Sequence, residues 1–174
     1  MKSIAKILSA LTLVFSSLQA SAYHSFLNTG EILPQGQIQV TGYLESVFNE
    51  YDGVNLNARG SMSITDELQA DVEIGTGEFD IMLAGYVKWV PIPDYEDQPA
   101  IGVRGGLHYI KIDDVSETGV TLAPFVSKAF QTDIGPFVPF VAIPFGISSR
   151  SVNPPLEDDT FFMAKLALGT EWTN

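Results

Sequence analysis

The chain has 174 residues, with 21 acidic and nine basic side chains, and its formal net charge at pH 7 is −12. Such acidity argues against binding to nucleic acid or to anionic head groups through charge alone. The chain contains no cysteine, so neither a disulfide framework nor a thiolate metal site is available to it. A length of this order suits one domain.

The first 22 residues are predicted to form a secretory signal peptide. A basic start with Lys2 and Lys6 precedes an apolar stretch from Ile7 to Phe15, and the small residues Ala20-Ser21-Ala22 follow it. The apolar stretch is far shorter than the ~20 residues that a membrane-spanning helix needs. Cleavage would remove both lysines and no acid, so the exported chain would begin at Tyr23 with a net charge of −14.

Eight later segments alternate apolar and polar side chains with a period of two, which indicates strands with two different faces. The clearest segment runs from Val54 to Thr65, where the even positions are apolar or glycine and the odd positions are polar. A helix would instead bring apolar residues back at every third or fourth position. The other segments are 36–48, 68–74, 79–89, 101–109 and 162–172, and two less regular ones, 120–130 and 136–148.

Short connections rich in Gly, Asp and Pro separate these segments, so neighbouring strands are predicted to form antiparallel hairpins. No helical segment is available to cover a sheet, and the strands must therefore close into a barrel or form a sandwich. Prolines 124, 136, 139 and 144 each remove a ladder donor from the two irregular segments. We expect a bulged or locally unpaired wall there, or no strand pair at all.

The position of the aromatic residues decides which face of the strands is predicted to point outward. A soluble barrel turns its apolar face inward, whereas a membrane barrel turns it outward. If Gly36 is placed at the periplasmic side, the aromatic residues of the apolar face fall into two belts, as expected at the two interfaces of a bilayer. One predicted belt contains Phe48, Phe79, Tyr109, Phe145 and Phe162, and the other contains Trp89, Phe130, Phe137 and Trp172.

The predicted polar face carries nearly equal numbers of acids and bases, as a closed interior lined by paired charges requires. We call this set the lumen charge network. An eight-stranded barrel is just wide enough for such side chains to fill it, so no general diffusion pore is expected. The network consists of Glu45, Arg59, Asp71, Glu73, Asp80, Lys88, Arg104, Lys165 and Glu171.

From Gly36 to Trp172 this pattern resembles the small outer-membrane barrels of Gram-negative bacteria, the class that includes the transmembrane domain of outer membrane protein A and the opacity-type proteins. The resemblance implies an all-β fold, an eight-stranded antiparallel up-and-down transmembrane β-barrel over residues 36–174, after an N-terminal segment at 23–35. It also implies a monomer in the outer membrane, with outer-membrane lipid and the barrel-assembly machinery as partners. Such barrels commonly end on an aromatic residue, so either Trp172 takes that part or the chain is a piece of a longer barrel.

No catalytic, cofactor-binding or metal site is predicted. His108 lies on the polar face, and hairpin pairing is expected to place it near Ala123, with no hydroxyl beside it. The acidic clusters at 94–97, 113–117 and 157–159 lack the spaced ligands and glycine of an EF-hand loop and are expected to be solvated turns. The sequence therefore favours a non-enzymatic barrel with a structural or surface-interaction role, without a cofactor or a nucleic-acid partner.

A second hypothesis keeps the exported barrel but places it in solution. In that case the apolar face would point inward and carry a small apolar ligand. The residues that would line this pocket are Leu56, Leu83, Val87, Leu107 and Leu166.

Overall fold

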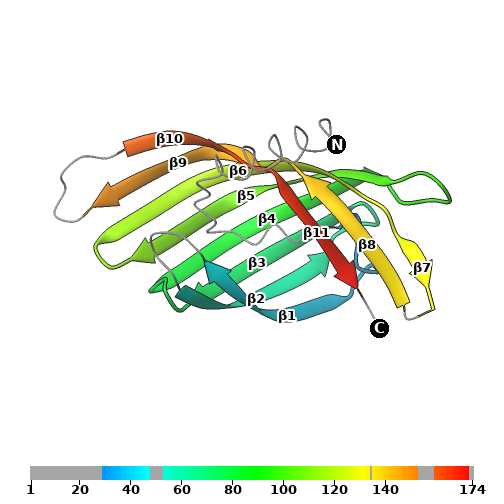
Figure 1. Ribbon diagram of the computed structural model, residues 1–174, viewed down its shortest axis with the longest axis horizontal. Coiled ribbons are helices and arrows are strands. Elements are labelled where there is room, and N and C mark those ends of the chain that lie inside the picture. The colour runs from blue at the N-terminus through cyan, green and yellow to red at the C-terminus, as the bar shows by residue number, and fades with distance from the viewer. Residues whose placement is uncertain (1–28, 48–52, 134, 153–158, 173–174) are drawn as a thin grey trace, which may run out of the picture.

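The computed structural model describes residues 29–47, 53–133, 135–152 and 159–172. The predicted signal peptide and Phe48 lie outside these ranges, as do the side chains of Glu45 and Trp172. The described residues form one antiparallel sheet of eleven strands (Figure 1) and contain no α-helix. No helix capable of crossing a membrane occurs among them.

The strands follow the chain from one edge of the sheet to the other. From β1 to β6 each strand pairs antiparallel with the next, and the order then continues through β8 to β11. The short β7 pairs only with β8, while β9 pairs with β6 and β10. The bounds are β1 Ile38–Val47, β2 Gly53–Ser63, β3 Leu68–Thr76, β4 Ile81–Ile92, β5 Ala100–Ile112, β6 Val115–Ser127, β7 Phe130–Thr132, β8 Gly135–Ala142, β9 Phe145–Val152, β10 Asp159–Ala164 and β11 Ala167–Trp172.

Strands β8 and β9 are two parts of one interrupted strand. Leu122 of β6 pairs with Phe145, and Phe125 pairs with Ala142, so both parts share one register along β6. Between them Pro144 cannot donate to the ladder, although the Ile143 amide still donates to the Pro124 carbonyl at 3.0 Å. The predicted locally unpaired wall is confirmed at this point, and the alternative without a strand pair is wrong. β10 and β11 continue one another in the same way along β9 and β8.

The hairpin between β5 and β6 is tighter than predicted. Its turn is Asp113-Asp114, with Asp113 in the left-handed region at φ 50°, whereas the sequence predicts a solvated turn over residues 113–117 and a strand only from 120. The sixth strand therefore starts at Val115 instead of Val120. As a consequence His108 pairs with Gly119, four residues away from its predicted neighbour.

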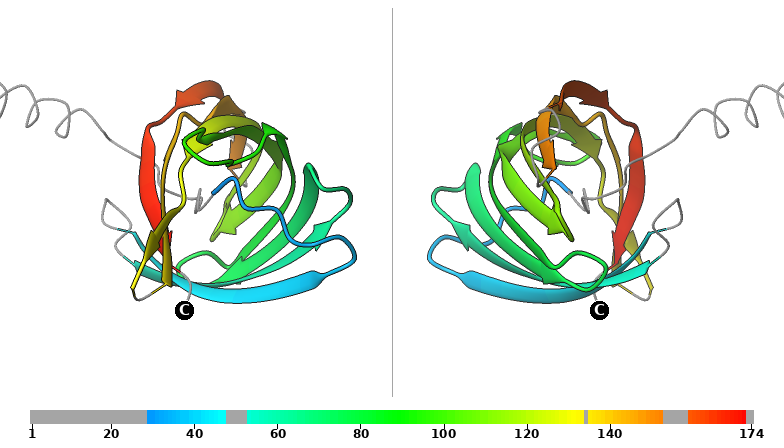
Figure 2. Two further views of the ribbon diagram at one scale, coloured as in Figure 1. Left: turned by 90° about the vertical axis from the view of Figure 1, so that its right-hand side faces the viewer. Right: turned by 90° about the vertical axis from the view of Figure 1, so that its left-hand side faces the viewer.

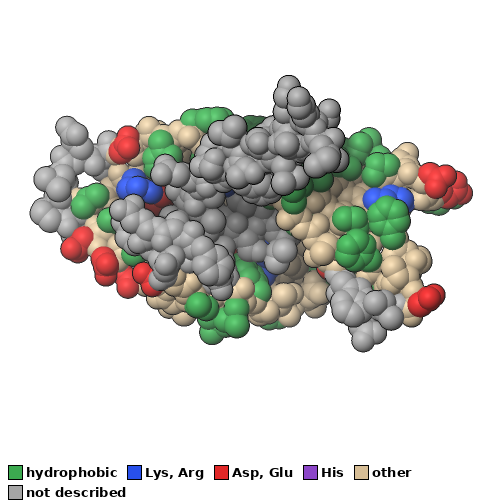
Figure 3. Space-filling view, in the orientation of Figure 1, with side chains coloured by type: hydrophobic (Ala, Val, Ile, Leu, Met, Phe, Trp, Pro, Cys, Tyr) green, Lys and Arg blue, Asp and Glu red, His purple; other side chains and the backbone are tan. Residues whose placement is uncertain are grey.

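The burial of side chains is opposite on the two faces of the sheet. The polar face of the central strands is buried, and the apolar face is exposed, as the strict alternation along β4 illustrates. Figure 2 shows that the sheet curls around an axis, and the buried polar side chains lie on the inside of this curl. In Figure 3 exposed hydrophobic side chains appear at many places on the outer surface. The five leucine and valine positions of the ligand-pocket hypothesis all lie on this outer face.

The two edges of the sheet, β1 and β11, share no backbone pairing among the described residues. In Figure 2 the sheet curls through most of a turn, and the end of β11 comes down toward β1. The all-β, antiparallel, up-and-down architecture is thus present, while the sheet itself is open.

Two small apolar clusters lie inside the curled sheet. One combines Phe79, Met82 and Ile110, and the other lies among β4, β5, β6 and β8. Phe79 was predicted to belong to an outward-facing aromatic belt, but it is 0% exposed. The reason is local: β4 begins only at Ile81, so Phe79 belongs to a turn and does not follow the alternation of the strand.

Candidate functional site

The centre of the buried polar face is occupied by Glu73 of β3, which binds two arginines through one oxygen. Its Oε1 accepts from Arg59 Nε of β2 at 2.6 Å and from Arg104 Nη2 of β5 at 2.5 Å. The second oxygen, Oε2, accepts from the Tyr43 hydroxyl of β1 at 3.3 Å. Charge-assisted bonds of this kind are the stronger class of hydrogen bond, and here they link four strands.

Arg104 is held on three sides within this group. Its Nη2 binds Glu73, its Nε lies 3.4 Å from Asp71 Oδ2, and its guanidinium lies 3.7 Å above the centre of the Tyr86 ring. Asp71 also accepts a bond from Gln69 Nε2 at 2.9 Å. We call Arg59, Asp71, Glu73 and Arg104 the central ion-pair cluster. Two acids face two bases in it, so the charges compensate one another on the buried face of the sheet.

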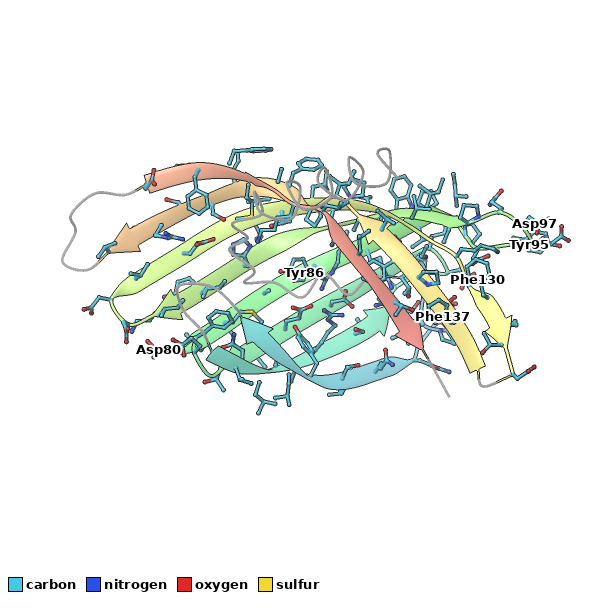
Figure 4. The ribbon with its side chains drawn as sticks, viewed as in Figure 1. Asp80, Tyr86, Tyr95, Asp97, Phe130 and Phe137 are labelled. Atoms are coloured by element: carbon cyan, nitrogen blue, oxygen red, sulfur yellow. The ribbon has the colours of Figure 1, made fainter. Side chains whose placement is uncertain are left out.

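The other predicted members of the lumen charge network lie elsewhere. Lys88 is buried but donates to backbone carbonyls of the segment before β1. Glu171 of β11 accepts from Thr29 Oγ1 at 2.8 Å. Asp80 is exposed, at the end of the sheet away from Tyr95 (Figure 4). Lys165 is half-buried between β10 and β11. The structure therefore brings four of the nine predicted residues into one cluster.

A second polar cluster, which the sequence did not predict, lies on β5, β6 and β9. Ser148 Oγ and Glu117 Oε1 lie 3.3 Å and 3.7 Å from His108 Nε2, and Arg150 donates to Glu117 at 3.1 Å. We call these four residues the His108 cluster. Glu117 and Arg150 were both predicted to lie in connections. The tight Asp113-Asp114 turn places Glu117 in β6 instead, and Arg150 belongs to β9, which extends to Val152. Counting back from a two-residue hairpin would have placed Glu117 in the strand.

The geometry of the His108 cluster differs from that of a hydrolytic triad. In a triad the base takes the serine proton at one ring nitrogen while the carboxylate holds the other nitrogen. Here Ser148 and Glu117 both face Nε2 of the same ring. Ser148 is also 0% exposed, so its hydroxyl has no access for a substrate. This arrangement fits the cross-linking of three strands.

Asp94, in the connection between β4 and β5, forms a separate ion pair with Lys128, which follows β6. The Ala129 amide also donates to Asp94, at 2.6 Å. Partial burial opposes ionisation of Asp94, but the hydrogen bonds from Ala129 and Lys128 outweigh it and hold the pKa of this carboxyl below its usual value. Asp94 is therefore a bonded part of the turn, in contrast to the solvated position predicted for it.

The predicted belts are partly brought together. Phe130 pairs with Phe137, and Phe137 pairs with Trp172, so three members of one belt are neighbours in register. Figure 4 places Phe130 and Phe137 at the end of the sheet that carries Tyr95, away from Asp80. Of the remaining members, Trp89, Tyr109 and Phe162 are exposed on the outer face, Phe145 is half-buried and Phe79 is buried.

A cavity of about 680 Å3 lies inside the curl, next to the central ion-pair cluster. Polar residues of several strands line it, among them Ser61, Gln69 and Lys88, together with the segment before β1. Within the described ranges no group of three or more His, Asp or Glu side chains forms a metal site.

Comparison of the chain with protein-family models, curated proteins and solved structures finds no match in any of the three. The chemistry of the described residues is therefore the basis for the function proposed below.

Proposed function

We propose that this protein is an outer-membrane β-barrel of eight strands, without enzymatic activity, that has a structural or surface-interaction role and a lumen filled by side chains. In this proposal β8 with β9, and β10 with β11, form the seventh and eighth strands. Pairing between β1 and the last strand closes the wall. The outer apolar face contacts outer-membrane lipid.

The observation that carries the proposal is the inverted burial of the two faces. Glu73 and Arg104 are 1% and 2% exposed, whereas Val40 on the outer face is 78% exposed. Soluble proteins rarely bury charged residues or present a continuous apolar surface around a sheet. In a bilayer the same distribution is favourable, because lipid covers the apolar face and the polar groups satisfy one another inside.

The proposed closure restricts which residues of the two edges can lie opposite one another. In β1 and β11 the outward positions alternate with inward ones, and residues opposite each other on paired strands face the same side. Outward residues Val40, Gly42 and Leu44 of β1 can therefore lie opposite Leu168 of β11, whereas the inward Thr41 and Tyr43 cannot. Unpaired edges would be costly in lipid, where no water satisfies the backbone.

Cross-linking tests closure directly, because the native chain contains no cysteine. Leu168→Cys is combined in turn with cysteine at 40, 41, 42, 43 and 44, and oxidation is followed by gel migration. We expect an intramolecular disulfide with one or two of the outward positions and none with the inward ones, since a disulfide needs Cα atoms about 4.4–6.8 Å apart. A disulfide between two chains would indicate edge pairing of separate copies and would contradict closure.

Extraction tests the membrane location. Washed cells are treated with high salt and alkaline carbonate, and a second sample with detergent. We expect the protein only in the detergent extract, with faster gel migration before boiling than after it. Release by salt would refute the membrane proposal and leave the outward apolar face to be covered by another protein.

The absence of enzymatic activity is inferred from the His108 cluster, whose serine is enclosed. Ser148→Ala should leave any ester hydrolysis by the purified barrel at the level of the unsubstituted protein. A loss of hydrolysis in this variant, with folding intact, would contradict the inference.

A further inference from the structure

The segment Thr29–Pro34, which we call the inner segment, lies inside the curled sheet. Figure 2 shows its beginning, in blue, near the centre of the curl, from where it runs outward to join β1. It lines the cavity of about 680 Å3 beside the central ion-pair cluster. The sheet therefore encloses a piece of its own chain that belongs to no strand.

Lys88 of β4 holds the inner segment through its backbone. The ammonium Nζ donates to the carbonyl of Glu31 at 2.5 Å and to that of Thr29 at 3.4 Å. Lys88 is 5% exposed, and both of its hydrogen bonds among the described residues end on this segment. Lys88 lies near Asp71 of the central ion-pair cluster, but its hydrogen bonds hold the inner segment instead.

Three other strands bind the inner segment with polar side chains. The Gly30 amide donates to Ser127 Oγ of β6 at 2.7 Å, and the Leu33 amide donates to Gln69 Oε1 of β3 at 3.2 Å. Thr29 Oγ1 donates to Glu171 of β11 at 2.8 Å. The polar groups of the segment thus find partners on β3, β4, β6 and β11.

The inner segment also fits the interior by shape. Ile32 packs against the apolar cluster among β4, β5, β6 and β8. A Cβ added at Gly30 would lie 2.2 Å from Ala100 Cβ, so only glycine fits at this point of the segment. Steric fit and hydrogen bonds together indicate a seated element and not a chance position of a terminal extension.

We propose that the inner segment is a removable plug that seals the cavity against solvent, and that Lys88 is its latch. The segment contributes no ladder bond to the sheet, so the wall can persist when it leaves. Its displacement would open a polar compartment lined by Ser61 and Gln69 to small water-soluble molecules. The sealing of the cavity requires the closed barrel proposed above, whereas the seating of the inner segment does not.

Cysteine accessibility tests the plug in the full chain. Ser61→Cys reports on the cavity, because Ser61 lines it and is buried. Ser148→Cys reports on the His108 cluster, whose serine is equally buried, and Gln35→Cys is an exposed reference. Each is placed in the unsubstituted background and with Lys88→Met or Gly30→Val, and the rate of reaction with a small charged methanethiosulfonate is measured in detergent.

Without a plug substitution, Ser61→Cys should react far more slowly than Gln35→Cys. Lys88→Met should raise its rate about tenfold or more, since a buried hydrogen bond to a charged group is lost. Gly30→Val should do the same by steric expulsion. Ser148→Cys should stay protected throughout. The matched controls are Lys111→Met, which removes an exposed lysine, and Gly85→Val, where an added Cβ meets nothing within 4 Å.

Three results would overturn the plug. Unchanged protection of Ser61→Cys in both variants would mean that the segment does not seal the cavity. Equal increases at Ser61→Cys and Ser148→Cys would mean that the segment is an integral support of the sheet. If Ser61→Cys reacts fast in the unsubstituted background, the Leu168→Cys cross-linking test shows which proposal is wrong. If the cross-link to β1 forms, the barrel is closed and the plug proposal is wrong. If it does not form, the closed-barrel proposal is wrong.

Discussion

Replacing Val87 with arginine places a charge in the middle of the outward face of β4. Val87 is 47% exposed, and its register neighbours are the small residues Ala70 and Gly105, so the longer side chain meets no steric obstacle. If this face contacts lipid, the cost is the transfer of the charge into hydrocarbon. That cost is about 2–4 kcal/mol at the midplane of a membrane barrel.

The depth of the position can be worked out from the strand. β4 has 12 residues and is therefore about 40 Å long, which at a tilt of about 40° spans about 30 Å of a bilayer. Ile92 lies at the end of the same strand, about 17 Å from Val87 along it and about 13 Å away in depth. Ile92→Arg should therefore cost only about 0–1 kcal/mol.

The assay is urea unfolding of the protein folded into phosphatidylcholine vesicles, with the folded fraction read from gel migration before boiling. The difference between the two variants is the critical quantity. In a soluble protein both arginines would lie on a hydrated surface, and each would change stability by less than about 0.5 kcal/mol. Equal and small effects at both positions would refute the reasoning from inverted burial.

Three further predictions concern the interior and the turns. Glu73→Ala should cost about 3–5 kcal/mol in urea unfolding because it leaves two buried arginines without their shared partner, whereas Asp66→Ala in an exposed turn should be nearly neutral. The pKa of the Asp94 carboxyl is lower in the folded protein than its usual value of about 3.9, so its ionised form stabilises the fold above that value. This stabilisation is lost as the pH falls through the pKa that Asp94 has in the folded protein. Asp94→Asn should remove this part of the acid dependence of the urea midpoint. Gly119→Ala brings a Cβ to 2.5 Å from Ser148 Oγ and should lower stability by about 1–3 kcal/mol, while Gly85→Ala should not; equal effects would contradict the tight packing over His108.

The sequence by itself determined which residues share a face. Alternation with a period of two is a local property of an extended chain, so the apolar positions of β2 to β5 and the polar positions opposite them could be read without a structure. For the same reason Arg59, Asp71, Glu73 and Arg104 could be assigned to one face. The interruption between β8 and β9 also followed from sequence, because proline lacks the amide that the ladder needs.

The tertiary structure decided which of these residues meet. Contacts between strands depend on register, and a turn of two residues in place of a longer connection moves every pairing of the hairpin. The Asp113-Asp114 turn thus placed Glu117 of β6 beside His108, and the register of β9 on β6 placed Ser148 there. Periodicity also does not predict where the chain goes outside a strand. Phe79 turns inward from a loop. The inner segment enters the curl because Lys88 and its neighbours provide hydrogen-bond partners there.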